Sequence, residues 1–205
     1  MVDIERYKKS FSTHKAELIQ DTDRYLIIDW RREDGSGDYY VNYIVDKKRG
    51  SLIVSGDLGD SIATWYNPVT PVNFVSYIKD IDYYISKMQC ASDKYTFKKN
   101  DIFDDIRDNL FEAAGCEDDL EWNEDFIRYD CDEYEDTQDF WETIERKIDE
   151  SLYDNQFVPT DSLYKIIEDF DSDCFQWIYN CGRRTHPRVY LWATGFIMAC
   201  EQLGI

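Results

Sequence analysis

A run of β-prone segments between residues 24 and 67 constrains the fold of this chain more than any other feature. RYLIIDWRR (24–32) and YYVNYIVDK (39–47) flank the turn-rich sequence EDGSGD, a pattern typical of a β-hairpin. Two shorter runs follow, SLIVSGD (51–57) and SIATWYN (61–67), each entered through a glycine-containing turn. We therefore predict a four-stranded antiparallel meander, in which the sequence GDLGD joins the third strand to the fourth.

Helical patterns precede and follow this meander. Residues 3–20 place several apolar side chains loosely on one helical face, which predicts an N-terminal helix with His14 on its surface. From Pro71 the apolar spacing changes from two residues to about 3.6, which predicts a helix ending near Met88. Further helices are predicted at 100–114, 137–153, 161–170 and 187–203.

These elements predict an α+β architecture, with helices covering one face of the sheet. We expect a single domain over residues 1–205. Residues 1–92 would contain the N-terminal helix, the sheet and the first crossing helix, and residues 93–205 would form a mostly helical, acidic portion. Residues 117–150 hold 16 Asp and Glu against three basic residues, in a chain whose net charge is −20. Because such a polyanion repels nucleic acid and anionic membranes, its expected partner is a basic protein.

The sequence offers no recognisable catalytic or metal-binding pattern. The six cysteines show no CxxC or CxxH spacing, and the first residues form no apolar signal core, so we expect reduced thiols in a cytoplasmic protein. No apolar run reaches the roughly 20 residues of a membrane span. There are only two histidines, His14 and His186, and neither a nucleophile elbow nor a phosphate-binding glycine loop occurs. We therefore assign no catalytic residue, no cofactor and no metal ligand.

One short motif leaves an alternative open. SLIVSGDLGDS (51–61) ends in a GDxxD pattern similar to that of metallophosphoesterases, which would make Asp57 or Asp60 a metal ligand of a hydrolase. The histidine ligands of those enzymes are missing, so the favoured interpretation is a tight turn. In that turn Gly56 and Gly59 take positive φ, and the two aspartates bond turn amides.

The sequence GRRTHPR (182–188) is a compact basic cluster. It has two interpretations, an anion site at the N-terminus of a helix and internal pairing with the acidic segment 117–150. At this overall charge, internal pairing is favoured.

The segment YDCDEYEDTQDFWE (129–142) mixes carboxylates with aromatic residues. Spaced carboxylates can stand in for duplex phosphates in a basic groove, while aromatic rings anchor the contact. The alternative is a solvated surface that keeps the protein soluble. The candidate partner-binding residues are Asp130, Asp132, Glu133, Tyr134, Glu135, Asp136, Asp139, Trp141 and Glu142.

The stretches RGSLIVSGDLGDSIATWYNP (49–68), SKMQCAS (86–92) and VYLWATGFIMACEQL (189–203) resemble uncharacterised accessory proteins of phages and prophages of Firmicutes. The resemblance implies a viral protein in the cytoplasm of a bacterial host, and it includes no catalytic motif. Small acidic accessory proteins of phages are similar in style to anti-CRISPR and other counter-defence inhibitors, several of which occupy the nucleic-acid channel of a nuclease.

The function implied is non-catalytic inhibition of a bacterial defence nuclease, with a CRISPR effector as the expected partner. Its PAM-reading site is an attractive target, because arginines there meet DNA. The alternatives are a metal-dependent hydrolase that uses the GDLGD turn and a phage interaction module with no inhibitory role.

Overall fold

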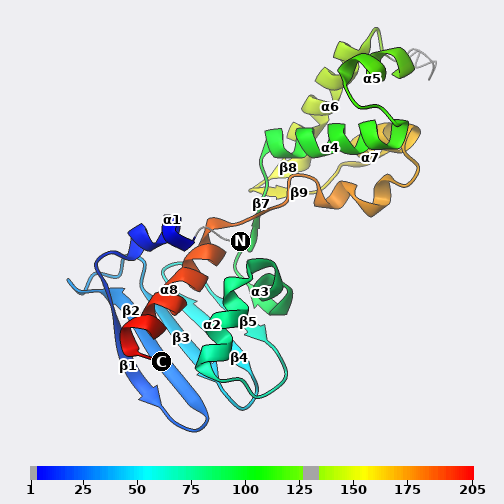
Figure 1. Cartoon of the computed structure of the whole chain (residues 1–205). Helices are drawn as coiled ribbons and strands as arrows, with labels where there is room; N and C mark the ends of the chain where they lie inside the picture. Colours follow the sequence, from blue (N-terminus) through cyan, green and yellow to red (C-terminus); the bar gives the residue numbers. More distant parts are fainter. Residues whose placement is uncertain (1–3, 127–133) are drawn as a thin grey trace. The chain divides into compact units, whose positions relative to one another are not determined.

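A computed structural model describes residues 4–126 and 134–205 of the chain (Figure 1). The chain divides into two compact units: unit 1 comprises residues 1–94 and 185–205, and unit 2 comprises residues 95–184. Unit 2 is therefore an insertion into the sequence of unit 1. The predicted subdivision at residues 92/93 lies next to this boundary. The last helix, however, which we had grouped with the acidic portion, belongs to unit 1.

The sheet of unit 1 is an antiparallel meander of six strands that follow one another in chain order. The strands are β1 (His14–Asp21), β2 (Tyr25–Arg32), β3 (Val41–Asp46), β4 (Ser51–Gly56), β5 (Ser61–Thr64) and β6 (Met88–Ala91). The four predicted strands correspond to β2 through β5, and the GDLGD turn joins β4 to β5 as predicted. The meander is thus confirmed, but the number of strands was wrong, because one more strand pairs at each edge.

The N-terminal helix predicted over residues 3–20 is wrong for most of its length. The helix α1 covers only Ile4–Lys8, the 3-10 turn η1 covers Lys9–Phe11, and the remainder forms β1. His14 is buried rather than exposed, with ring centroids 5.0 Å from Phe11 and 5.6 Å from Trp30.

The cause of this error is tertiary structure that a helical apolar pattern does not report. Pairing with β2 satisfies one edge of β1. On the other edge, the Gln202 side chain accepts a hydrogen bond from the Ala16 amide and donates one to the His14 carbonyl. The side-chain amide thereby takes the place of a neighbouring strand.

The helix predicted from Pro71 to Met88 is interrupted. The structure has α2 (Pro71–Lys79) and α3 (Ile81–Lys87), separated by Asp80. Asp80 ends α2 and caps α3, because its carboxylate accepts a hydrogen bond from the Tyr83 amide. Met88, predicted to lie at the end of the helix, begins β6.

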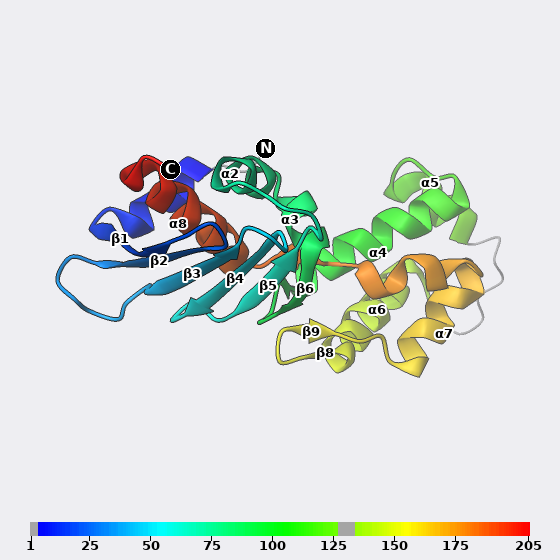
Figure 2. The ribbon, with the colours of Figure 1, turned by 90° about the horizontal axis from the view of Figure 1, so that it is seen from below.

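The helix α8 (Pro187–Leu203) agrees with the predicted range and covers the inner face of the sheet. Figure 2 shows α1, α2, α3 and α8 on the same side of the strands. The Tyr43 hydroxyl donates a hydrogen bond of 2.9 Å to the Trp192 carbonyl of α8. Gly195 permits this close approach, since a Cβ at that position would lie 2.4 Å from the tyrosine oxygen. The core of unit 1 is thus completed by the last helix of the chain.

Unit 2 is mainly helical, with a core of its own. Its helices are α4 (Lys99–Ala114), α5 (Asp119–Phe126), α6 (Thr137–Ser151) and α7 (Asp161–Phe170), followed by the 3-10 turns η3 (Cys174–Gln176) and η4 (Ile178–Asn180). A hairpin, β8 (Leu152–Tyr153) and β9 (Gln156–Phe157), joins α6 to α7. The chain enters through β7 (Tyr95–Thr96) and leaves through β10 (Arg184–Thr185), which pair with each other. The predictions of α4, α6 and α7 are confirmed to within two residues, whereas α5 was not predicted.

The helices of unit 2 contribute apolar residues at a spacing of four to a common core. This core includes Ile102, Ile106 and Leu110 of α4, Phe140, Ile144 and Ile148 of α6, and Leu163 and Ile167 of α7. Within residues 4–126 and 134–205, no helix is long and apolar enough to span a membrane. The five described cysteines are free, and Cys131 lies outside the described residues.

Candidate functional site

The charge of the chain is concentrated in unit 2. This unit contains 27 Asp and Glu against nine Lys and Arg, a net charge of −18. Unit 1 contains 16 Asp and Glu against 14 Lys and Arg, a net charge of only −2. The acidity is therefore a property of the inserted unit rather than of the whole surface, which makes unit 2 the candidate functional region.

Several carboxylates of unit 2 oppose the electrostatics of its own helices. The last turns of α4, α6 and α7 contain no basic residue. They contain Glu112, Asp149 with Glu150, and Glu168 with Asp169, respectively. Because the C-terminus of a helix carries partial negative charge, acidic side chains there are unfavourable. In α6 the two carboxylates pair with Lys99 and Lys147, but among the described residues those at the ends of α4 and α7 form no salt bridge.

The exposed side of α4 carries a further unfavourable arrangement. Asp104, Asp108 and Glu112 follow one another at a spacing of four residues, and all three are exposed. Side chains at this spacing are neighbours, and like charges there destabilise a helix. Among the described residues, none of the three side chains forms a hydrogen bond or a salt bridge. We call these three residues the α4 stripe.

The cations of unit 2 are largely engaged within the unit. Arg184 binds both carboxylate oxygens of Asp105 at 2.9 and 3.0 Å, and this lowers the pKa of that carboxyl. Lys99 contacts Glu145 and Asp149, and the hydrogen bond with Asp149 raises the pKa of the ammonium group. Further cations in contact with side chains of the unit are Lys147 with Glu150, Arg107 over Phe111 and Arg183 over Tyr95. Few cations thus remain to neutralise the surface carboxylates.

Two of the predicted binding residues have a local structural role. The Asp136 carboxylate accepts a hydrogen bond from the Asp139 amide, and the Asp139 carboxylate accepts one from the Glu135 amide. The first bond caps the N-terminus of α6, and the second holds the residue that precedes the cap. Glu135 and Glu142 are exposed, and Glu142 accepts a hydrogen bond from Gln138. Asp136 and Asp139 thus have a structural role at the start of α6, whether or not they also contact a partner.

The two predicted aromatic anchors are partly buried in unit 2. The Trp141 ring lies 4.8 Å from Phe140, 5.6 Å from Trp122 and 5.5 Å from Phe103. The Tyr134 ring packs edge-on against Phe140 at 5.2 Å. Both side chains therefore contribute to the packing of unit 2.

Three of the predicted residues, Asp130, Asp132 and Glu133, lie outside the described residues. The structure also draws attention to acidic residues that the prediction omitted. The α4 stripe precedes the predicted segment 117–150, and the acidic end of α7 follows it. Both could have been found by counting charges at helical spacing rather than by searching for the densest acidic run.

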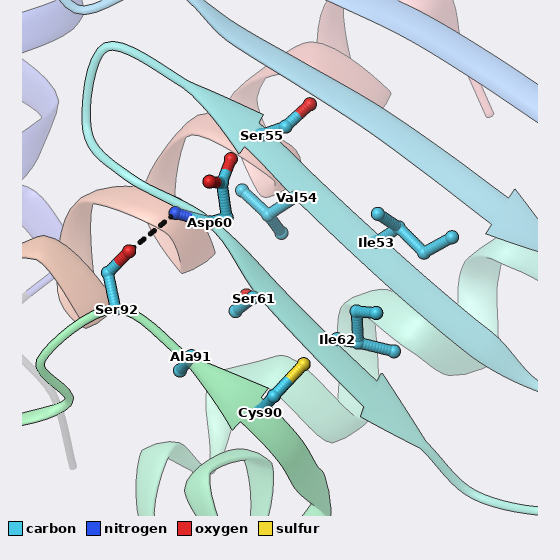
Figure 3. Close-up of a pocket in the computed structure, with 9 residues that line it drawn as sticks. All are labelled: Ile53, Val54, Ser55, Asp60, Ser61, Ile62, Cys90, Ala91 and Ser92. Atoms are coloured by element: carbon cyan, nitrogen blue, oxygen red, sulfur yellow. Dashed lines mark hydrogen bonds between the residues drawn. The ribbon is translucent and has the colours of Figure 1, made fainter.

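The GDLGD turn makes contacts that differ from those predicted. Gly56 and Gly59 have φ of 140° and 86°, as expected. The Asp57 carboxylate bonds the Tyr39 amide of the β2–β3 loop rather than an amide of its own turn, so that part of the prediction was wrong. Asp60 is held through its backbone amide, which donates to Ser92 Oγ at 3.0 Å (Figure 3). Within the described residues no three His, Cys, Asp or Glu side chains are placed to hold a metal ion.

An open depression of about 450 Å³ lies on the sheet beside this turn (Figure 3). Its lining combines the apolar side chains of Ile53, Ile62 and Cys90 with Ser55 and Ser92. Among the described residues near it, no group of side chains is arranged as a nucleophile with its base. The depression therefore gives the hydrolase alternative no support.

The basic cluster at residues 182–188 is engaged in internal contacts. Arg184 pairs with Asp105 of α4, and Arg188 lies 3.9 Å from Asp93. The His186 Nδ1 accepts a hydrogen bond from the Arg188 amide and caps α8, and burial lowers the pKa of its ring. The cluster thus pairs internally, but the predicted pairing with the acidic segment 117–150 was wrong, because both partners lie outside that segment.

Comparison of the chain with family models, with curated proteins and with solved structures finds no match. The functional argument therefore rests on the geometry and charge described above.

Proposed function

We propose that this protein is a phage-encoded, non-catalytic inhibitor that acts in the cytoplasm of the bacterial host. In this proposal, unit 2 occupies the nucleic-acid-binding groove of a defence nuclease, and a CRISPR effector is the expected target. The resemblance of residues 49–68 to phage accessory proteins supports the viral origin.

The observation that carries the proposal is the α4 stripe on a unit with a net charge of −18. Its three carboxylates recur about every 6 Å along the helix axis, since each residue rises about 1.5 Å. A DNA strand presents a phosphate about every 3.4 Å along its axis, so the stripe resembles a sparser row of phosphates. A groove lined by Lys and Arg would bind both in the same way, because its cations replace the counterions that surround the carboxylates or the phosphates.

The cost of the stripe to its own helix supports a role in binding. Residues that oppose local stability without a compensating contact are typical of functional surfaces. A partner that supplies cations would remove the repulsion between Asp104, Asp108 and Glu112. Binding would then recover energy that folding loses.

The test uses a panel of purified RNA-guided nucleases, each with its guide RNA and a fluorescent target DNA. We expect the full chain to inhibit cleavage by at least one nuclease at a stoichiometric ratio. Inhibition should weaken between 0.05 and 0.5 M salt, because the Debye length falls from about 14 to about 4 Å over that range. Target DNA added first should compete with the protein.

Two variants with the same change in charge separate mimicry from a general effect of acidity. The stripe variant carries Asp104→Asn, Asp108→Asn and Glu112→Gln. The matched control carries Asp23→Asn, Glu33→Gln and Glu201→Gln, all exposed residues of unit 1. We expect only the stripe variant to lose inhibition. The proposal is overturned if no nuclease of the panel is inhibited, and mimicry by the stripe is overturned if both variants inhibit equally.

A further inference from the structure

The segment that follows α7 is held rigidly against the core of unit 2. The Asp171 carboxylate accepts hydrogen bonds of 2.8 Å from the Asp173 amide and from Trp177 Nε1. Cys174 and Ile178 are fully buried in the core. The turns η3 and η4 are therefore fixed at both ends.

Two aromatic side chains project from these turns into solvent. Phe175 is 57% exposed and Tyr179 is 54% exposed. Each directly follows one of the buried residues, Cys174 and Ile178, so the inward contacts of these residues direct the neighbouring rings outward. Isolated exposed apolar residues are common. Two aromatic rings displayed four residues apart on a fixed scaffold instead resemble the anchors of an interface, where aromatic residues are enriched.

Carboxylates surround this aromatic pair. Glu168 and Asp169 lie in the last turn of α7, which contains no basic residue, and Asp173 lies two residues before Phe175. All three are exposed, and within the described residues none of their carboxylates forms a salt bridge. Because this helix end also carries partial negative charge, it favours a nearby cation.

The tyrosine of the pair lies near the acidic helix. The pKa of Tyr164 in α7 is raised by burial and by Cys174, with smaller contributions from Glu168 and Tyr179. The helix α7 packs against η3, and η3 packs against η4. The acidic end of α7 and the two exposed rings therefore belong to neighbouring elements of unit 2.

The chemistry of this surface fits arginine better than lysine. A guanidinium group can stack on an aromatic ring and bind a carboxylate through two N–H groups, whereas an ammonium group acts as a point charge. The chain places cations of both kinds over its own rings, with Arg183 4.8 Å from the centroid of Tyr95 and Lys87 4.7 Å from that of Tyr83, so the preference for arginine rests on its two-pronged binding of a carboxylate. The exposed rings of Phe175 and Tyr179 could accept arginines from another molecule in this way.

We infer that Phe175 and Tyr179, together with Glu168, Asp169 and Asp173, form a docking surface for an arginine-rich segment of a partner protein. This inference builds on the proposed function, since it names the residues that anchor the basic partner. It proposes these two rings as the aromatic anchors in place of Tyr134 and Trp141, which are partly buried and pack against the core.

The test measures binding of two fluorescent peptides to the full chain, one of ten arginines and one of ten lysines, by anisotropy at 0.15 M salt. The aromatic variant carries Phe175→Ala and Tyr179→Ala. The control variant carries Tyr153→Ala and Val158→Ala, which remove side chains of unit 2 that are 84% and 65% exposed. We expect the aromatic variant to bind the arginine peptide about five- to thirtyfold more weakly, from two exposed cation–π contacts. The control should bind it as the wild type does, and the lysine peptide should change less.

Amide shifts in NMR spectra locate the contact. Addition of the arginine peptide should shift the amides of residues 168–179 more than those of the β8–β9 hairpin. Equal weakening by the aromatic and control variants, or shifts confined to other segments, would refute the docking surface.

The outcomes also separate this inference from the proposed function. If the stripe variant loses nuclease inhibition while the aromatic variant retains both inhibition and peptide binding, the docking surface is refuted and the inhibitory function stands. If the aromatic variant loses peptide binding while the wild type inhibits no nuclease, the docking surface stands and the inhibitory function is refuted.

Discussion

Neutralising the α4 stripe should stabilise unit 2 while it weakens binding. In the stripe variant, the changes to Asn and Gln remove the repulsion between Asp104 and Asp108 and between Asp108 and Glu112. They also remove the negative charge of Glu112 from the C-terminal turn of α4. Asn and Gln have helix propensities close to those of Asp and Glu, so the change in charge is the main perturbation.

The expected gain in the free energy of unfolding is about 1 kcal/mol at low salt. Each repulsive pair costs about 0.2–0.5 kcal/mol. An unfavourable charge at a helix end costs about 0.3–1 kcal/mol. For a unit of this size, about 1 kcal/mol corresponds to a rise in Tm of about 4–8 °C. The gain should nearly vanish at 1 M salt, where the Debye length of about 3 Å is shorter than the spacing of about 5–6 Å between these side chains.

Thermal unfolding of the full chain by circular dichroism at 10 mM and 1 M NaCl measures this effect, and hydrogen exchange of α4 peptides assigns it to unit 2. Asp136→Ala is the control of opposite sign, because it removes the cap of α6 and should cost about 1 kcal/mol. A stripe variant that is no more stable than the wild type at 10 mM NaCl would refute the electrostatic reasoning. So would a gain of the same size at both salt concentrations.

Three further predictions concern single residues. Burial lowers the pKa of His14 below 6.5 in the folded protein, so the contribution of His14 to the stability of unit 1 should be complete above pH 6.5. This contribution should be lost as the pH falls through the pKa of His14 in the folded state. Denaturant unfolding at pH 7.5 and 5.5 should therefore show a loss of stability that His14→Gln abolishes. Gly195→Ala should destabilise unit 1 by about 1–3 kcal/mol through overlap with the buried tyrosine hydroxyl. Gly37→Ala, whose methyl group would meet no atom within 4 Å, should leave the unfolding midpoint unchanged. Asp105→Asn should destabilise unit 2 by about 1–3 kcal/mol at pH 7, as measured by urea unfolding. Because Arg184 lowers the pKa of Asp105, this difference should be complete above about pH 4 and disappear as the pH falls further.

The elements that were predicted correctly are those with local signals. Pro187 begins α8 and Gly204 ends it in the left-handed conformation, so its range could be read from the sequence. Gly115 ends α4 in the same way. The edge strand β1 has no such signal, because its partners β2 and Gln202 lie elsewhere in the chain. The interruption at Asp80 was missed because the apolar spacing continues across it.

For the candidate site, the sequence indicates an acidic surface but not which side chains form it. The excess of carboxylates is visible in the sequence, but whether an aromatic residue lies inside or outside is not. Trp141 and Phe175 both stand among acidic residues, yet the first packs against Trp122 and the second projects into solvent. Burial depends on which face of its element meets the core of unit 2, and only the packed fold determines that.

The position of α8 after unit 2 has a consequence for synthesis of the chain. The strands of unit 1 leave the ribosome well before the helix that covers them, since all of residues 95–184 must be made in between. At about 5–20 residues per second, this interval lasts roughly 5 to 20 s, during which the apolar face of the sheet lacks the part of its cover that α8 supplies. The segment being made in that interval carries a charge of −18 and a core of its own. It would fold first and keep neighbouring nascent chains apart by repulsion, as an acidic solubility tag does, until the last helix closes the sheet.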